Sequence, residues 1–189
     1  MSTNVGPIDF TVFSSVAPGD VAWSNPGNAA ASDNVRASAY LDDDSLVTTQ
    51  YLRAGSPSGL AAIPADAEIV GIMVEVERCC DNNAPKDYSV RLSNAGTLIG
   101  NDKAQAVRWP YVTVEAYASY GGAEDLWGCA PGYWTPANLS DLQFNISATS
   151  DYYGAATVYV DHIRITIWYE PTEVQSVVIP TVIPERIPW

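Results

Sequence analysis

Positive charge and histidine are scarce in this chain. Its 189 residues include 9 lysines and arginines against 22 aspartates and glutamates, a formal net charge of −13. Binding to nucleic-acid phosphates or to anionic membranes requires clustered cations, so we expect neither a nucleic-acid nor a membrane partner. The single histidine, His162, has no nucleophile motif around it, and we expect it at a surface or an interface rather than in a catalytic triad.

Cysteines are also few. Cys79, Cys80 and Cys129 are three in number, and an adjacent pair followed by a distant third does not match the spacing of a zinc site. We predict free thiols that are buried or half-buried. No phosphate-cradling glycine-rich motif occurs, and the acidic residues are too numerous for any one pair to stand out as catalytic. We therefore expect a protein that is not an enzyme and needs no cofactor.

Long hydrophobic runs are missing as well. No stretch of eighteen apolar residues exists, so we expect no membrane-spanning helix. Met1–Phe10 has neither a basic segment nor an apolar core, which argues against a secretory signal peptide. We accordingly expect synthesis in a cytoplasm.

What the chain does contain is β-strand pattern almost throughout. Turn-rich pieces such as Ser24–Asn28 and Gly55–Gly59 separate the apolar runs, and no window shows a sustained helical period. We predict an all-β, antiparallel two-sheet sandwich of jelly-roll type over residues 1–170. The expected strands are Ile8–Val16, Val35–Leu41, Leu46–Arg53, Ile69–Arg78, Tyr88–Leu92, Val112–Ala118, Leu142–Ala148 and Ala156–Tyr169.

Two of these strands allow a prediction for single side chains. In Ile69–Arg78 the apolar and acidic residues alternate, which predicts one buried and one wet face. In Ala156–Tyr169 the apolar residues change parity midway, so a β-bulge near Asp161 and His162 is needed to keep one face buried. His162, Arg164 and Thr166 would then lie together on the outer face.

Aromatic residues gather between residues 109 and 134, in a stretch rich in glycine and proline. One interpretation is that the rings close the ends of the sandwich, because large rings are usually buried. The other is that Trp109, Trp127 and Trp134 form a surface for sugar stacking or protein docking.

The acidic run Asp42, Asp43 and Asp44 joins two expected strands. A solvated hairpin turn explains it, and the alternative is a weak Ca²⁺ site built from carboxylate oxygens. The run lacks EF-hand spacing, so we predict no metal site of a known pattern.

The last nineteen residues, 171–189, differ in character from the rest. Ile-Pro recurs at residues 179–180, 183–184 and 187–188, which excludes a helix and favours an extended arm of roughly 60 Å at ~3.3 Å per residue. Because the arm is apolar, we predict that it pairs as an extra strand with the sheet edge of a neighbouring subunit. The alternative is that it folds back on its own domain. The residues expected to contact a partner are Val177, Val178, Ile179, Val182, Ile183, Ile187 and Trp189.

Several segments carry a resemblance to a known class. Ala62–Arg78 and Ala155–Tyr169, with Trp109-Pro110 and Tyr120–Gly128 between them, resemble a β-sandwich module of tailed-phage structural proteins. The resemblance implies a non-enzymatic virion protein that decorates or cements a capsid, or belongs to the neck or tail, assembled in the host cytoplasm with other virion subunits and as a homo-oligomer. Val160–Ile165 also resembles the last strand of jelly-roll carbohydrate-binding modules, which implies a glycan- or receptor-binding alternative.

Overall fold

The computed structural model describes residues 1–42, 46–82, 84–150 and 154–172. Nine β-strands and four short 3₁₀ turns make up its regular structure, and this part of the chain contains no α-helix. The strands are β1 (Thr3–Val16), β2 (Ala37–Leu41), β3 (Tyr51–Pro57), β4 (Glu68–Cys80), β5 (Pro85–Asn94), β6 (Thr97–Ile99), β7 (Ala116–Gly122), β8 (Leu142–Ser150) and β9 (Ala156–Glu170).

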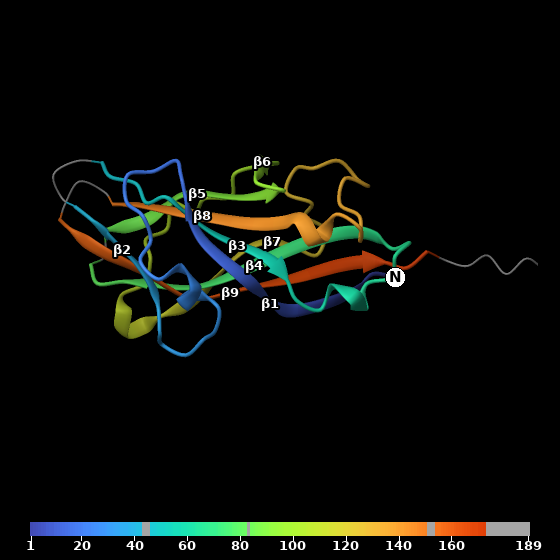
Figure 1. Ribbon diagram of the computed structural model, residues 1–189, viewed down its shortest axis with the longest axis horizontal. Helices are drawn as coiled ribbons and strands as arrows, with labels where there is room; N and C mark the ends of the chain where they lie inside the picture. The colour runs from blue at the N-terminus through green and yellow to red at the C-terminus, as the bar shows by residue number, and fades with distance from the viewer. Residues whose placement is uncertain (43–45, 83, 151–153, 173–189) are drawn as a thin grey trace, which may run out of the picture.

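The strands form two packed layers, and all strand pairings are antiparallel. Sheet A contains β2, β9, β4, β7 and the first part of β1, and sheet B contains β6, β5, β8, β3 and the second part of β1. Strand β1 pairs with β9 through Thr3–Asp9 and with β3 through Phe10–Val16, so it passes from one layer to the other (Figure 1). The predicted all-β antiparallel sandwich is confirmed.

The core lies between the layers and is made by alternate residues of both sheets. Ile72, Val74 and Val76 of β4 are fully buried, while Glu75 and Glu77 are half-buried on the other face, as the alternation predicts. Strand β8 contributes the opposite wall with Leu142, Phe144, Ile146 and Ala148, all fully buried.

The β-bulge predicted in the last long strand is confirmed. Glu77 of β4 pairs with His162, but the next residue, Arg78, pairs with Val160, so Asp161 is the extra residue. The bulge lets Val158 and Val160 share a buried face with Ile163, Ile165 and Ile167, all of which are fully buried.

Three local expectations are wrong. Strands β2 and β3 do not pair with each other, because β2 joins β9 in sheet A and β3 joins β1 and β8 in sheet B. The expected hairpin between these two strands is therefore absent from the described pairings. Residues 112–114 form a 3₁₀ turn, so the seventh strand begins only at Ala116, and the short β6 gave no recognisable pattern.

The described chain ends just beyond the sandwich. Strand β9 ends at Glu170, and the hydroxyl of Thr172 donates to the carbonyl of Asp66 at 2.5 Å. The amino terminus lies at the same end of the molecule (Figure 1). Residues 173–189, and with them the partner-contact residues predicted in the arm, lie outside the described residues, so the division into a domain and an arm stays a prediction.

No helix in these described segments is long and apolar enough to cross a membrane.

Candidate functional site

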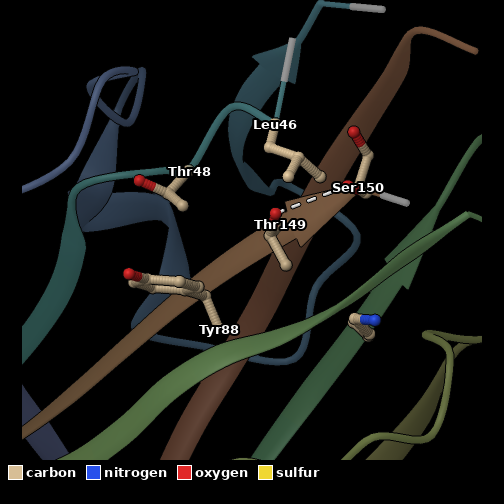
Figure 2. Close-up of a pocket in the computed structure, with 6 residues that line it drawn as sticks. Leu46, Thr48, Tyr88, Thr149 and Ser150 are labelled. Carbon is tan, nitrogen blue, oxygen red and sulfur yellow. Dashed lines mark hydrogen bonds between the residues drawn. The ribbon is translucent and has the colours of Figure 1, made fainter. Parts of the chain in front are cut away.

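A groove lies on the outer face of sheet B, where β5 and β8 meet the segment that precedes β3. Its larger part has a volume of about 350 Å³ and is lined by Leu46, Thr48, Lys86, Tyr88, Thr149 and Ser150 (Figure 2). A smaller part of about 100 Å³ shares Thr48 and Tyr88 and adds Pro18, Gly19, Thr49, Tyr51 and Ser147. Because two residues line both parts, we treat them as one site and call it the sheet B groove. Small-molecule sites typically start at ~300 Å³.

Tyr88 owes its position in the groove to a β-bulge. Asp87 of β5 pairs with Ala148 of β8, and Ser89 pairs with Ser147, so Tyr88 is the extra residue between them. Asp87 therefore faces the interior, while Tyr88 lies on the surface with 59% of its area exposed. The exposed ring offers a flat apolar face beside polar neighbours. In Figure 2 the Tyr88 ring is drawn below the Thr48 side chain, which also lines the groove.

The interior carboxylate of Asp87 anchors this bulge. It accepts hydrogen bonds from the Trp109 indole at 2.8 Å, the Tyr120 hydroxyl at 2.8 Å and the Gln105 backbone at 2.9 Å. It also pairs with Arg78, whose guanidinium lies 4.9 Å from the centre of the Trp109 ring. Four groups thus hold the residue next to Tyr88.

A chain of hydroxyl groups crosses the floor of the groove. The Ser89 hydroxyl donates to Asp102 at 2.6 Å, so it accepts the proton of the Tyr51 hydroxyl, 2.8 Å away. Asp102 is held by the backbone N–H groups of Val90 at 2.9 Å and Ala104 at 3.0 Å. The Tyr51 oxygen keeps its acceptor capacity towards the groove, with its proton already committed.

The threonines of the groove are oriented in the same way. The Thr149 hydroxyl donates to the Val47 carbonyl at 3.1 Å, and the Thr48 hydroxyl donates to Asp20 at 3.2 Å. Gly19 allows this arrangement, because a Cβ there would lie 2.3 Å from the Thr49 carbonyl oxygen. Each hydroxyl therefore presents free acceptor lone pairs in a fixed direction.

The described residues that line the groove include no carboxylate, imidazole or thiol. They offer hydroxyl groups, one amine and two tyrosine rings, which suit hydrogen bonding and stacking.

The three tryptophans predicted as a stacking or docking surface do not form one. Trp109, Trp127 and Trp134 are at most 1% exposed, and the Trp127 indole donates to the Ile72 carbonyl at 2.9 Å. That prediction is wrong, because the segment containing these rings folds onto the sandwich and buries them. The alternative interpretation, in which aromatic rings close the core, describes them correctly.

His162 is more enclosed than predicted. It is 8% exposed and lies on the outer face of sheet A beneath neighbouring side chains. Its Nδ1 lies 2.8 Å from the Tyr117 hydroxyl and its Nε2 lies 3.0 Å from Asp9. Arg164 shares this face and pairs with Glu75 at 2.9 Å. Both ring nitrogens of His162 thus have a partner within the chain.

The predicted free thiols are confirmed. Cys79 and Cys80 are buried and Cys129 is half-buried. Burial, with the charge of nearby Glu115, raises the pKa of Cys79 to about 12, and burial raises the pKa of Cys80 to about 11. Neither thiol is reactive near neutral pH.

The weak Ca²⁺ prediction at the acidic run falls mostly outside the described residues, since only Asp42 is described and it is exposed. The described chain contains no group of three or more acidic, histidine or cysteine side chains that could hold a metal ion.

The groove residues were missed from the sequence, although one pattern pointed towards them. Every outward position of β8 is polar and uncharged, in the order Gln143, Asn145, Ser147 and Thr149. A solvated outer face normally carries charged residues, so this row of amides and hydroxyls was the signal in the sequence that this face differs from a plain solvated one. The bulge that exposes Tyr88 left no such pattern.

Comparison with known proteins assigns no family to this chain. No family model matches the chain, and no curated protein matches it. Among solved structures, the chain is similar to the carbohydrate-binding module TmCBM61, determined in complex with β-1,4-galactotriose. The two share 13% sequence identity with a TM-score of 0.43, over 83% of this chain and 89% of that chain.

Proposed function

We propose that this protein is a non-catalytic binding module that holds a carbohydrate in the sheet B groove. The observation that carries the proposal is an exposed tyrosine ring beside a set of hydroxyl groups whose hydrogen bonds are already fixed. A sugar ring has one flat face of C–H groups and a rim of hydroxyls. The Tyr88 ring can stack on the C–H face of the sugar, and the oriented acceptors of Tyr51, Thr48 and Thr149 can bind its hydroxyl groups.

Preorganisation supports the proposal further. Ligand binding loses less free energy to ordering when the contacting side chains are already held. Here the hydroxyl chain ends on Asp102, which two backbone N–H groups fix, and the Tyr88 bulge is held through Asp87.

The test is a glycan array with the full-length protein, followed by titration calorimetry with the glycans it retains. Tyr88→Ala should weaken binding about tenfold, because stacking on an aromatic ring contributes roughly 0.5–1.5 kcal/mol beyond area and 1.4 kcal/mol is tenfold. Tyr40→Ala is the matched control, because Tyr40 is equally exposed at 58% but lies on β2 of sheet A. An array on which nothing binds, or equal affinities for both variants, would contradict the proposal.

A second candidate function is a structural role in a tailed-phage virion, as a capsid-decorating, neck or tail protein. The observation that favours it is the Ile-Pro repeat of residues 171–189, which follows directly on the exposed end of the last strand at Glu170. In this role the arm would dock on neighbouring virion subunits, and copies of the chain would form a homo-oligomer.

Deletion of residues 171–189 tests the second function. The shortened chain should remain folded and soluble by circular dichroism but should no longer co-sediment with particles, and light scattering of both proteins would report the oligomer. Undiminished particle occupancy after the deletion would remove the support for a docking arm.

A further inference from the structure

A row of three polar side chains continues the sheet B groove. Arg53 of β3 and Arg91 of β5 both pair with Asn145 of β8, so the two arginines flank the asparagine on one outer face. With neighbouring strands ~4.8 Å apart, the two arginine Cα atoms are separated by roughly 10 Å. We call these three residues the arginine row.

The row lies one pleat along from the groove. Tyr51, Ser89 and Ser147 are each two residues from a member of the row on the same strand, and residues two apart share a face about 7 Å from each other. A ligand longer than one sugar ring that lies across the groove therefore reaches the row.

The arginines are held but not neutralised. Arg53 donates its Nε to the Asn145 side-chain oxygen at 2.7 Å, and Arg91 donates Nη2 to the Gly100 carbonyl at 2.8 Å. The Nε of Arg91 is buried and has no hydrogen-bond partner within the described structure. Burial lowers the pKa of Arg53.

This arrangement is unusual in so acidic a chain. Four other cations pair with carboxylates: Arg36 with Glu115, Arg78 with Asp87, Lys103 with Asp125 and Arg164 with Glu75. Among the described residues, no carboxylate pairs with Arg53 or Arg91, although acidic side chains outnumber basic ones by 22 to 9. A desolvated guanidinium without a counter-ion favours a carboxylate as its missing partner.

We infer that the sheet B groove selects acidic carbohydrates, whose carboxylate lies between Arg53 and Arg91. This inference rests on the proposed carbohydrate-binding function and narrows its ligand class to uronate- or sialate-containing glycans. The net charge of −13 repels an anion at long range, but salt screens that field beyond ~8 Å, whereas the two guanidinium groups act at contact.

The experiment uses an array on which each acidic glycan stands beside its methyl ester, which removes the charge and keeps the sugar. The full-length protein should bind the acids at least tenfold more tightly than the esters. Arg53→Gln and Arg91→Gln should each remove that preference, while Arg53→Lys should keep part of it. Arg164→Gln is the charge-matched control on sheet A and should leave the preference unchanged. Circular dichroism and thermal melting establish that each variant is folded.

The outcomes separate the two proposals. Esters or neutral glycans bound as tightly as the acids, with Arg91→Gln within twofold of the wild type, would overturn the acidic preference and leave carbohydrate binding standing. No binding to any glycan would overturn both. A preference for acids that survives both Arg→Gln variants would place the carboxylate elsewhere and overturn the assignment of the arginine row.

Discussion

Removal of the Asp87 carboxylate should destabilise the protein more than any change at its surface. The side chain of Asp87 is fully buried and that of its partner Arg78 is 3% exposed. Asp87→Ala would strand a buried guanidinium, a change that typically costs about 3–5 kcal/mol. It would also remove the acceptor of Trp109 and Tyr120, each worth roughly 1–3 kcal/mol when left unpaired. These effects overlap, so we expect a loss of about 4 kcal/mol, a large share of the ~5–15 kcal/mol typical of a domain.

The stranded charge is the larger part of this loss, and a second variant isolates it. The Nε of Arg78 is buried without a hydrogen-bond partner in the described structure, so Asp87 supplies most of its compensation. Arg78→Met keeps a flexible apolar side chain against the Trp109 ring and removes the charge. The double variant Arg78→Met/Asp87→Ala should therefore be more stable than Asp87→Ala alone.

Urea unfolding followed by tryptophan fluorescence measures these free energies. Glu75→Ala is the control, because it breaks a comparable pair with Arg164 on the outer face, where the side chains are 17% and 29% exposed. This pair is half-buried and partly screened by water, so its loss should cost less than the loss of the fully buried pair. A loss for Asp87→Ala no larger than that for Glu75→Ala would refute the reasoning. So would a double variant at least as unstable as the single one.

Two further predictions concern the polar layer on sheet A and the thiols. Burial, with nearby Glu115 and Glu77, raises the pKa of Asp161 above its usual 3.8, so the charged form of this side chain opposes folding at neutral pH. Asp161→Asn should therefore raise the urea midpoint at pH 7. This gain should vanish as the pH falls below 3.8, where the aspartate is protonated in both the folded and the unfolded chain. Iodoacetamide at pH 8 should label Cys129 first, while Cys79, with its pKa near 12, should be protected until urea unfolds the chain, which mass spectrometry would show. A variant no more stable at pH 7, or early labelling of Cys79, would contradict these predictions.

The fold was predictable because its main signals are local. Alternation along β4 and the parity change in β9 follow from the two-residue period of a strand, and a single buried face then requires the bulge at Asp161. Which strands pair with each other was harder to predict from the sequence. The strands on either side of the acidic run look like a hairpin in sequence, but β1 supplies partners in both layers, and that topology separates β2 from β3.

The site was largely hidden from sequence reasoning for a related reason. Tyr51, Ser89 and Ser147 are far apart in the chain and meet only because β3, β8 and β5 are neighbours in sheet B. The tryptophans were conspicuous in the sequence, but large apolar side chains are more often buried than exposed. All three tryptophans predicted for the site are buried in the core. The exposed Tyr88 depends on a single inserted residue opposite β8, which no periodicity reveals.

The two outer faces of the sandwich differ in which charged groups they leave unpaired. On sheet A the cation Arg164 pairs with Glu75, and the unpartnered buried groups of the described chain there are oxygens of Glu77 and Asp161. On sheet B the Ser89 hydroxyl donates to Asp102, and Arg53 and Arg91 have no carboxylate partner among the described residues. A held guanidinium without a counter-ion gains hydrogen bonds and charge pairing from an anionic ligand at small ordering cost, whereas unpaired carboxylate oxygens repel it. That difference supports the proposed placement of the binding site on sheet B.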